Sequence, residues 1–567
     1  MLKLLNLIRK TCISRSLALL AILVSLAACN SEKKDSPLID TIYTGRFITL
    51  DSAQPEVESV AVANGKIVFM GTRESIQQLA GKDVPIVEIP GVATPGIIDP
   101  HVHVSEFGGE LEQLNLRGKN IPEIQALLKQ KASQVEPGEW IYGGGWEQTH
   151  FASGVFPYAS DLDSVSPNNP VMFMRIGGHS AWVNSKALEL AGINAETKDI
   201  FGGTIVRLEN NEPSGMLLEA AVELINEVRP ESDTPEQIER RIRRAVNEYA
   251  RLGLTGVHDA GVSLEKIAIY KKLLAENALP VRVNVMVNGY QKDAVDHYLA
   301  TGPEIELGNG MLNIRTFKIF VDGGLGARGA ELSAPYADAP HSHGLRQMED
   351  EELDEFVKAA NSKGFQVAAH AIGDLAVERT FDAYERANVK ATDRYRMEHA
   401  SMVSPKNINR FVDLGIVASM QPMFLSEYGR WGKDRVGLER EAWILPIKDI
   451  VATGAVLASS TDYPAADTGD PRATLYSLVS RKNLDREPEN GWYPQQIIER
   501  ETALRSMTEG AAYSSFQENS IGKLSQGYYA DFTVFEQNPL EVEVEDIPTI
   551  GVQMTVVVGK VTYQADN

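Results

Sequence analysis

The sequence predicts an α/β fold: a (β/α)8 barrel, an inserted subdomain beside its mouth, and a small β-sandwich formed by the two ends of the chain. The long middle of the chain alternates short β-rich runs with helical patterns, which is typical of parallel sheets and barrels. A short β-rich region lies on either side of it, with too few strands for a core of its own. With 567 residues, 43% of them apolar, the chain is long enough for a large core and a second domain.

Eight apolar runs of strand length occur in the middle region, and eight parallel strands with helices between them favour a closed barrel. The gap between the first two runs is far too long for one crossover helix. Residues from about 108 to 236 are therefore expected to form the inserted subdomain, within a barrel domain of residues 92–519. The expected barrel strands are Val92–Ile98, Thr255–His258, Val281–Val287, Ile314–Val321, Gln366–His370, Tyr395–Glu398, Ile416–Met420 and Val456–Ser460.

The two flanking regions, residues 38–91 and 520–567, are expected to pair with each other as one small sandwich, which brings the chain ends together. Asn64-Gly65 is a hairpin turn signal between two of the strands. The expected flanking strands are Ile42–Leu50, Ser59–Ala63, Lys66–Gly71, Ile86–Ile89, Phe532–Phe535 and Met554–Thr562.

Residues 1–28 have the pattern of a secretion signal, with a basic front and an apolar core over Leu17–Leu26 that is too short for a membrane-spanning helix. The core ends in Leu26-Ala-Ala-Cys29, which resembles a bacterial lipobox; in that family of signals the cysteine becomes the lipidated first residue. By resemblance to Gram-negative lipoproteins, Asn30 favours the outer membrane, facing the periplasm, and residues 29–37 form a tether. The alternative is a plain secretory signal with an incidental cysteine.

Cysteine content and charge narrow the function classes. The only cysteines are Cys12 and Cys29, so the mature chain has no disulfide and no cysteine nucleophile or metal ligand. Lipid on Cys29 anchors a protein to a membrane without spanning it. The net charge of −22 argues against nucleic-acid binding, which needs clustered basic charge. The partner is expected to be a small-molecule substrate, and the oligomeric state stays open.

The run Ala93-Thr-Pro-Gly-Ile-Ile-Asp-Pro-His101-Val-His103 places two histidines one residue apart at the end of an apolar strand. Because side chains alternate along a strand, His101 and His103 share a face, which suits the binding of one metal ion. A single His-x-His pair is weak evidence, since two ordinary loop histidines give the same pattern. The other metal-ligand residue types decide between these interpretations.

In a barrel, catalytic residues gather at the carboxyl ends of the strands. His370, His399 and Asp462 fall at the ends of the fifth, sixth and eighth expected strands, and Lys318 lies on the fourth. Together with the histidine pair, five strands each deliver at least one residue of metal-binding type to one end of the barrel. Chance placement is hard to reconcile with this pattern, so the sequence predicts a metal site.

Lys318 shares a strand face with Thr316, Phe320 and Asp322, and that face is expected to point into the barrel. A buried lysine is costly without a partner, and burial lowers its pKa. A neutral amine can take up carbon dioxide, giving a carbamate that bridges two metals. The alternative is a lysine paired with Asp322 or Asp462.

These residues resemble the amidohydrolase superfamily, in the subgroup that includes the YtcJ-like proteins and an N-substituted formamide deformylase. The resemblance covers nearly everything after the signal and says little about the substrate. The motifs that carry it are Thr94-Pro-Gly-Ile-Ile-Asp-Pro-His-Val-His103, Gly178-His-Ser-Ala-Trp-Val-Asn-Ser-Lys-Ala-Leu188, Pro213-Ser-Gly-Met216, Phe317-Lys-Ile-Phe-Val-Asp-Gly323, His370-Ala-Ile-Gly-Asp374, Glu398-His399, Gln421-Pro422, Asp462 and Gly527-Tyr-Tyr-Ala-Asp531.

The resemblance implies a metal-dependent hydrolase with a defined ligand set. It implies that His101 and His103 hold one metal with Asp462, that His370 and His399 hold a second, and that carboxylated Lys318 bridges the two. A site with one metal is also open. Zinc is the expected ion because nitrogen and carboxylate ligands suit it.

The expected reaction is hydrolysis of a non-peptide carbon–nitrogen bond of amide, formamide or N-acyl type. A bound metal lowers the pKa of water to near 7. Asp462 is the candidate base, and the second metal or His179 would stabilise the developing oxyanion. Esters and lactones would react by the same steps. An alternative from another class of function is an exported lipoprotein with the same barrel that is non-catalytic or regulatory. A third interpretation, a solute-binding lipoprotein, predicts a two-lobed fold, which the barrel pattern disfavours.

Three residues are candidates for substrate contact. His179 lies in a glycine-containing loop of the inserted subdomain, where contact with substrate and a structural loop role are equally plausible. Trp146 follows three glycines and would either wall the pocket or simply pack. Arg328, after the Lys318 strand, would bind a substrate carboxylate through its fork of donors or else be solvent-exposed. His258 is expected to support the site rather than bind metal.

Overall fold

The structure is a computed structural model that describes residues 39–79, 83–175, 180–200, 203–230 and 234–566. At its centre, eight parallel strands form one sheet in the order β5-β12-β13-β15-β16-β17-β18-β19. The sheet is nearly closed: the backbone N–H of Asp462, just after the last strand, donates to His101 of the first at 2.9 Å. The strands are β5 Ile97–Val102, β12 Leu254–Val262, β13 Arg282–Asn288, β15 Leu312–Phe320, β16 Gln366–Ala371, β17 Arg396–His399, β18 Val417–Met420 and β19 Leu457–Ser459.

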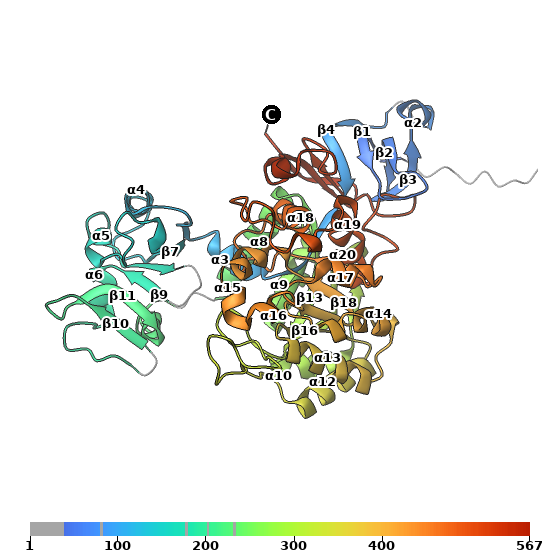
Figure 1. Cartoon of the computed structure of the whole chain (residues 1–567). Coiled ribbons are helices and arrows are strands. Elements are labelled where there is room, and N and C mark those ends of the chain that lie inside the picture. Colours follow the sequence, from blue (N-terminus) through green and yellow to red (C-terminus); the bar gives the residue numbers. More distant parts are fainter. Residues whose placement is uncertain (1–38, 80–82, 176–179, 201–202, 231–233, 567) are drawn as a thin grey trace, which may run out of the picture.

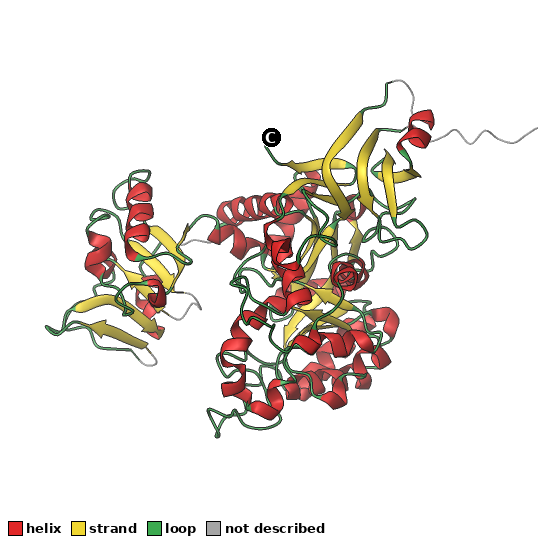
Figure 2. Cartoon of the chain, turned by 45° about the horizontal axis from the view of Figure 1, so that its top comes forward, coloured by secondary structure: helices red, strands yellow, loops and turns green. Residues whose placement is uncertain are grey.

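Helices connect these strands and cover the outside of the sheet (Figures 1 and 2), which confirms the predicted barrel. The connecting helices begin at sequence signals: α8, for example, is capped by Thr234, whose side chain accepts the N–H of Gln237, and has Pro235 in its first turn. The helices between the strands are α8 Pro235–Arg251, α9 Leu264–Ala275, α10 Lys292–Thr301, α12 Asp350–Ser362, α13 Asp374–Arg386, α14 Arg410–Leu414 and α17 Ile447–Ala452. Additional elements are β14 Glu304–Glu306, α11 Leu307–Gly310, α15 Leu425–Val436, α16 Leu438–Glu441, α18 Pro471–Ser480, α19 Arg500–Ser506 and α20 Glu509–Ser514.

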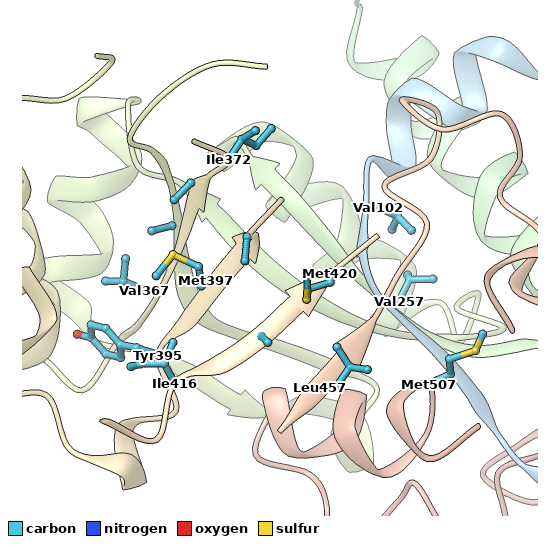
Figure 3. Packing of buried hydrophobic residues seen from close by; sticks show 14 of the residues in the cluster. Val102, Val257, Val367, Ile372, Tyr395, Met397, Ile416, Met420, Leu457 and Met507 are labelled. Atoms are coloured by element: carbon cyan, nitrogen blue, oxygen red, sulfur yellow. The ribbon is translucent and has the colours of Figure 1, made fainter. Parts of the chain in front are cut away.

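Alternation along the strands separates packing residues from site residues. On β15, Phe317 and Ile319 are fully buried, and Phe317 meets Phe356 of α12 edge-on with ring centroids 5.5 Å apart. Lys318, between them, takes the opposite face, as the sequence predicts. Figure 3 shows the same core on neighbouring strands, with Val367 and Met397 among the buried side chains.

The first barrel strand differs from the prediction. Residues Val92 to Pro95 belong to β4 (Ile86–Pro95), which lies in another sheet, and the barrel begins at Ile97. Gly96 is the point of transfer, since its N–H donates to Asp531 at 3.0 Å. A Cβ on Gly96 would lie 2.2 Å from Oγ1 of Thr255, so only glycine allows this approach to the next barrel strand.

The two ends of the chain form one sheet of seven strands, in the order β22-β21-β20-β4-β1-β2-β3. The sequence predicts a sandwich of the two regions, whereas in the structure their strands form one continuous sheet, joined where β20 pairs with β4. Phe532 of β20 packs edge-on against Tyr43 and Phe47 of β1. The elements are β1 Thr41–Ile48, β2 Glu56–Ala63, β3 Lys66–Gly71, α2 Arg73–Leu79, β4, β20 Phe532–Phe535, β21 Val552–Val557 and β22 Lys560–Gln564.

A third, six-stranded sheet in the order β10-β11-β9-β8-β7-β6 lies between β5 and β12 in the sequence and stands to one side of the barrel (Figure 1). The chain leaves the barrel through α3 (Val104–Glu110) and returns through α8, and these helices pack so closely that a Cβ on Gly108 would lie 2.1 Å from the Arg241 carbonyl oxygen. Its elements are β6 Leu114–Asn115, α4 Ile121–Ala132, β7 Ile141–Trp146, α5 Ala159–Asp163, β8 Val171–Arg175, β9 Ser180–Val183, α6 Ser185–Leu190, β10 Gly203–Arg207, β11 Pro213–Glu219 and α7 Glu223–Asn226.

Within the described part of the chain, no helix combines the length and apolar character needed to cross a membrane. The predicted secretion signal and tether, including Cys29, lie outside the described residues.

Candidate metal centre

The structure gathers all six predicted ligand residues at the carboxyl end of the barrel. His101 and His103 come from the end of β5, His370 from β16, His399 from β17 and Asp462 from the segment after β19, while Lys318 projects from β15. Three of them, His101, His399 and Asp462, place potential ligand atoms within 4.8 Å of one another. Nε2 of His101 and Nε2 of His103 lie 3.4 and 3.2 Å from Oδ1 of Asp462.

Three of the histidines are oriented by hydrogen-bond acceptors. Nδ1 of His101 lies 2.5 Å from Oε2 of Glu398, and Nδ1 of His103 lies 3.1 Å from the carbonyl oxygen of Ala260. Nδ1 of His399 lies 2.8 Å from Oε1 of Gln421. Because each partner accepts, Nδ1 carries the proton and Nε2 is left with a lone pair for a metal.

Unpartnered buried atoms at the centre fit a cation. Oδ1 of Asp462 accepts no hydrogen bond from the described residues, although two imidazole nitrogens lie within 3.4 Å of it. Both ring nitrogens of the buried His370 likewise have no hydrogen-bond partner among the described residues. A buried polar group without a partner costs about 1–3 kcal/mol, and a metal ion would satisfy these atoms together.

Burial lowers the pKa of His101, His370 and His399, the last to about 3, which favours the neutral ring that binds a metal. At His103 burial acts in the same direction, but the contact with Asp462 outweighs it and raises the pKa. Burial also tends to raise the pKa of Asp462, but the neighbouring His101 and His103 outweigh it and hold that pKa far below the usual range. Neutral imidazoles and an ionised carboxylate are the metal-binding forms.

Two of the predicted ligands have strained backbones. His399 and Asp462 adopt φ values of 71° and 60°, in the left-handed region that residues other than glycine seldom occupy. Such conformations cost about 1–3 kcal/mol and persist only where the surroundings hold them in place. Their occurrence at two converging ligand positions is typical of a functional site.

Lys318 is buried beside His101. Its Nζ lies 3.2 Å from Nε2 of His101 and 4.7 Å from the ring centre of Phe320. Burial lowers the pKa of Lys318 to about 8. Within the described residues it forms no ion pair with Asp322 or Asp462 at 4.0 Å or less; Asp322 instead accepts three backbone N–H groups, from Glu331, Ile372 and Gly373.

A cavity of about 270 Å³ opens above the cluster. Five of the six predicted ligand residues line it, and His101 is not among the described lining residues. Apolar side chains and the exposed Glu427 complete the lining. The described residues that line it are His103, Lys318, Phe320, Gly324, Leu325, Gly326, His370, Ile372, His399, Phe424, Glu427, Tyr428, Asp462 and Ala465.

The three residues predicted to contact substrate differ in their positions relative to the cavity and the described residues. His179 lies outside the described residues. Trp146 is fully buried in the six-stranded sheet, stacks on Phe151 and donates from Nε1 to the Phe173 carbonyl oxygen at 2.8 Å, so it packs. Arg328 directs both arms of its guanidinium to Asp338 at 3.0 and 2.9 Å, and it is not one of the described residues lining the cavity. Substrate roles for these residues stay predictions.

Sequence reasoning gave no role to several residues that surround the ligands. Glu398 contacts His101, and Gln421 contacts His399; their motifs carry the family resemblance, but the residues look like ordinary polar neighbours in the sequence. Arg396 and Glu398 are two residues apart on β17, so strand alternation predicts that they share a face. His258 is buried and bonded to Arg396, with 2.9 Å between Nδ1 and Nη1, which fits its expected supporting place.

The amidohydrolase family profile matches residues 91–563. LONG AFTER FAR-RED 3 of Arabidopsis thaliana is 32% identical over 546 residues, covering 92% of this chain and 91% of that protein. YtcJ of Bacillus subtilis (strain 168) is 31% identical over 536 residues, covering 92% and 99%. An N-substituted formamide deformylase of Arthrobacter pascens is 25% identical over 552 residues, covering 92% and 98%.

Solved structures agree with these matches. An uncharacterized metal-dependent hydrolase from Pyrococcus horikoshii shares 31% identity and a TM-score of 0.71, covering 89% of this chain and 99% of that one. The atrazine chlorohydrolase TrzN of Arthrobacter aurescens, solved with zinc, covers 92% and 94% at a TM-score of 0.51; at 15% identity it supports the fold alone. The barrel, the donor residues at its strand ends and these matches lead to one conclusion: the chain belongs to the amidohydrolase family.

Proposed function

We propose that the protein is a zinc-dependent hydrolase that cleaves carbon–nitrogen bonds outside peptides, in amides, formamides or N-acyl compounds. The observation that carries this proposal is the unpartnered Oδ1 of Asp462, which lies within 3.4 Å of two imidazole nitrogens at the floor of a cavity. Nitrogen and carboxylate donors suit zinc. The similarity to an N-substituted formamide deformylase over 92% of this chain supports the class of bond.

The ligand assignments belong to the same proposal. His101, His103 and Asp462 would hold one ion, His370 and His399 a second, and Lys318, carboxylated on Nζ, would bridge them. Zinc in such a site supplies Lewis-acid chemistry and makes water acidic enough to ionise near neutral pH. The lowered pKa of Lys318, about 8 because of burial, supports formation of a carbamate from the neutral amine.

The residues of the chain divide the remaining work. Asp462, which lines the cavity, would accept a proton from the attacking water and deliver it to the leaving nitrogen. Phe320, Leu325 and Phe424 line the cavity and would exclude bulk water around the reacting group. His179 stays a candidate for stabilising the developing negative charge.

The test combines metal content with a substrate panel. Protein lacking residues 1–29 is expressed with zinc and bicarbonate and measured by elemental mass spectrometry, then assayed on N-substituted formamides, N-acyl compounds, esters and lactones. About two zinc ions per chain and turnover of carbon–nitrogen substrates are the expected results. About one zinc ion per chain would agree with a hydrolase but contradict a second ion bridged by Lys318. A preference for esters or lactones would contradict the proposed cleavage of carbon–nitrogen bonds. Absence of bound metal would favour a non-catalytic role.

A further inference from the structure

A buried carboxylate lies behind the predicted ligand His101. Glu398 is fully buried on β17, and its Oε2 lies 2.5 Å from Nδ1 of His101, on the side of the ring away from Asp462. Ser419 of β18 donates from Oγ to the same oxygen at 2.7 Å. This carboxylate therefore contacts a ligand without reaching the cavity, which it does not line.

Arg396 forms a bidentate ion pair with Glu398. Its guanidinium donates to both carboxylate oxygens, at 2.6 and 3.1 Å, and both side chains are at most 1% exposed. The guanidinium also donates to the carbonyl oxygen of Pro100 at 2.7 Å and to Oγ of Ser419 at 3.1 Å, and it lies 2.9 Å from Nδ1 of His258. We call this cluster of Arg396, Glu398, Ser419, His258 and the Pro100 carbonyl the ligand support. It joins strands β5, β12, β17 and β18.

We propose that Glu398 is a positioning residue of the metal centre, which acts through His101. Its carboxylate holds the proton on Nδ1, aims Nε2 at the metal and makes that nitrogen a stronger donor. Arg396 neutralises the buried carboxylate and fixes it in place. The inference rests on the proposed function in one respect, that His101 binds the metal.

A carboxylate hydrogen-bonded to the outer nitrogen of a ligating histidine fixes the tautomer and raises its basicity, and loss of such a partner typically lowers metal affinity by about 10–100-fold. A lone buried carboxylate would be costly, whereas a paired one is tolerated. The bidentate contact with Arg396 pairs the charge of Glu398, while Oε2 still contacts Nδ1 of His101.

A purely structural role is the competing explanation, since the ligand support also ties four strands together. Glu398→Gln keeps the shape and removes the charge, but it leaves Arg396 unpaired in the core. The double variant Arg396→Gln with Glu398→Gln removes both charges and tests whether restored stability also restores metal binding. Glu331→Gln is a control, because Glu331 is also a buried carboxylate, paired with Arg379 at 2.5 Å and with Arg346 at 2.9 Å, and none of its hydrogen bonds or ion pairs among the described residues reaches a predicted ligand.

The experiment measures zinc affinity by chelator competition, and melting temperature of the metal-free protein, for the unaltered protein and these three variants. We expect about 10–100-fold weaker zinc binding in Glu398→Gln and in the double variant, with the melting temperature partly restored in the latter, and unaltered affinity in Glu331→Gln. Unchanged affinity in Glu398→Gln, or affinity that returns together with stability in the double variant, overturns the inference. If the unaltered protein binds no zinc, the proposed function itself fails, and this inference with it.

Discussion

At the scale of single residues, three of the four predicted histidine ligands are held by a hydrogen-bond acceptor at the ring nitrogen that points away from the metal centre. Glu398, the Ala260 carbonyl and Gln421 each accept from an imidazole Nδ1, at 2.5, 3.1 and 2.8 Å. In the neutral ring these contacts place the proton on Nδ1, and Nε2 of His101 and of His103 then faces Oδ1 of Asp462 with a lone pair. The ligand set of the proposed zinc site is thus prepared by hydrogen bonds before any ion binds.

Asp462→Asn tests the proposed base. The amide keeps the shape but cannot take the proton, so we expect turnover to fall by about 10²–10⁴-fold, with the fold intact. Turnover, zinc content and melting temperature are measured on the same preparations. Asp467→Asn, an exposed carboxylate five residues away, is the control and should retain turnover. Normal turnover in Asp462→Asn would reject the assignment.

Lys318 gives a pH dependence with a defined sign. Burial lowers the pKa of its amine from 10.5 to about 8, so in the folded metal-free protein the neutral, carbon-dioxide-reactive form grows as pH rises through 8. From pH 7 to pH 9 at fixed dissolved carbon dioxide, we expect the rate of recovery of zinc binding to rise about tenfold, following the neutral fraction.

Lys318→Ala should lose both metal and activity, and added short carboxylates should restore part of each. Zinc uptake is measured with and without bicarbonate for both proteins. If zinc binding by the unaltered protein recovers at a rate independent of pH and carbon dioxide, or if Lys318→Ala keeps full activity, the carbamate bridge is contradicted.

At the scale of secondary-structure elements, strand register decides which residues meet. Parallel pairing of β16 with β17 sets His370 beside Glu398 and Ala371 beside His399. One strand, β17, therefore carries the predicted ligand His399 and two residues of the ligand support, Arg396 and Glu398, within four residues. Similarly, β4 and β5 are consecutive in sequence but lie in different sheets, because Gly96 lets the chain pass against Thr255.

The seven-stranded sheet is attached to the barrel by a buried ion pair. Arg282 at the start of β13 donates to Asp531, before β20, at 2.6 and 3.2 Å, and both side chains are at most 4% exposed. Asp531→Asn removes one charge and leaves the other buried, so we expect about 3–5 kcal/mol lower stability, followed by denaturant unfolding. Asp296→Asn, in the exposed pair with Lys292, should change little. Equal effects of the two substitutions would contradict this role.

At the scale of the whole molecule, the chain ends converge on one sheet while the cavity opens at the carboxyl end of the barrel strands. The six-stranded sheet stands beside the barrel, joined through α3 and α8 (Figure 1). Residues at the ends of several barrel strands line the cavity together with residues of the connecting segments. Substrate selection is accordingly expected to depend on those segments.

Attachment to a membrane is a further prediction that concerns the whole molecule. We propose that the mature chain is anchored through lipid on Cys29 to the outer membrane, facing the periplasm. Cys29→Ser should then move the protein from the membrane fraction to the soluble periplasmic fraction, with zinc content unchanged, because the barrel does not depend on the anchor. Fractionation and metal analysis of both proteins check this. A membrane fraction unaffected by Cys29→Ser would contradict the lipobox.

The sequence by itself determined the barrel and the candidate ligands, because both depend on local patterns. Alternation along a strand puts His101 and His103 on one face, and strand ends in a parallel barrel meet at one edge. Tertiary structure alone decided contacts between distant residues. His101 and Glu398 are 297 positions apart, and no periodicity links them. The burial of Trp146, the pairing of Arg328 with Asp338 and the sheet to which Val92 belongs were equally beyond local pattern, since each depends on which neighbour the folded chain brings into contact.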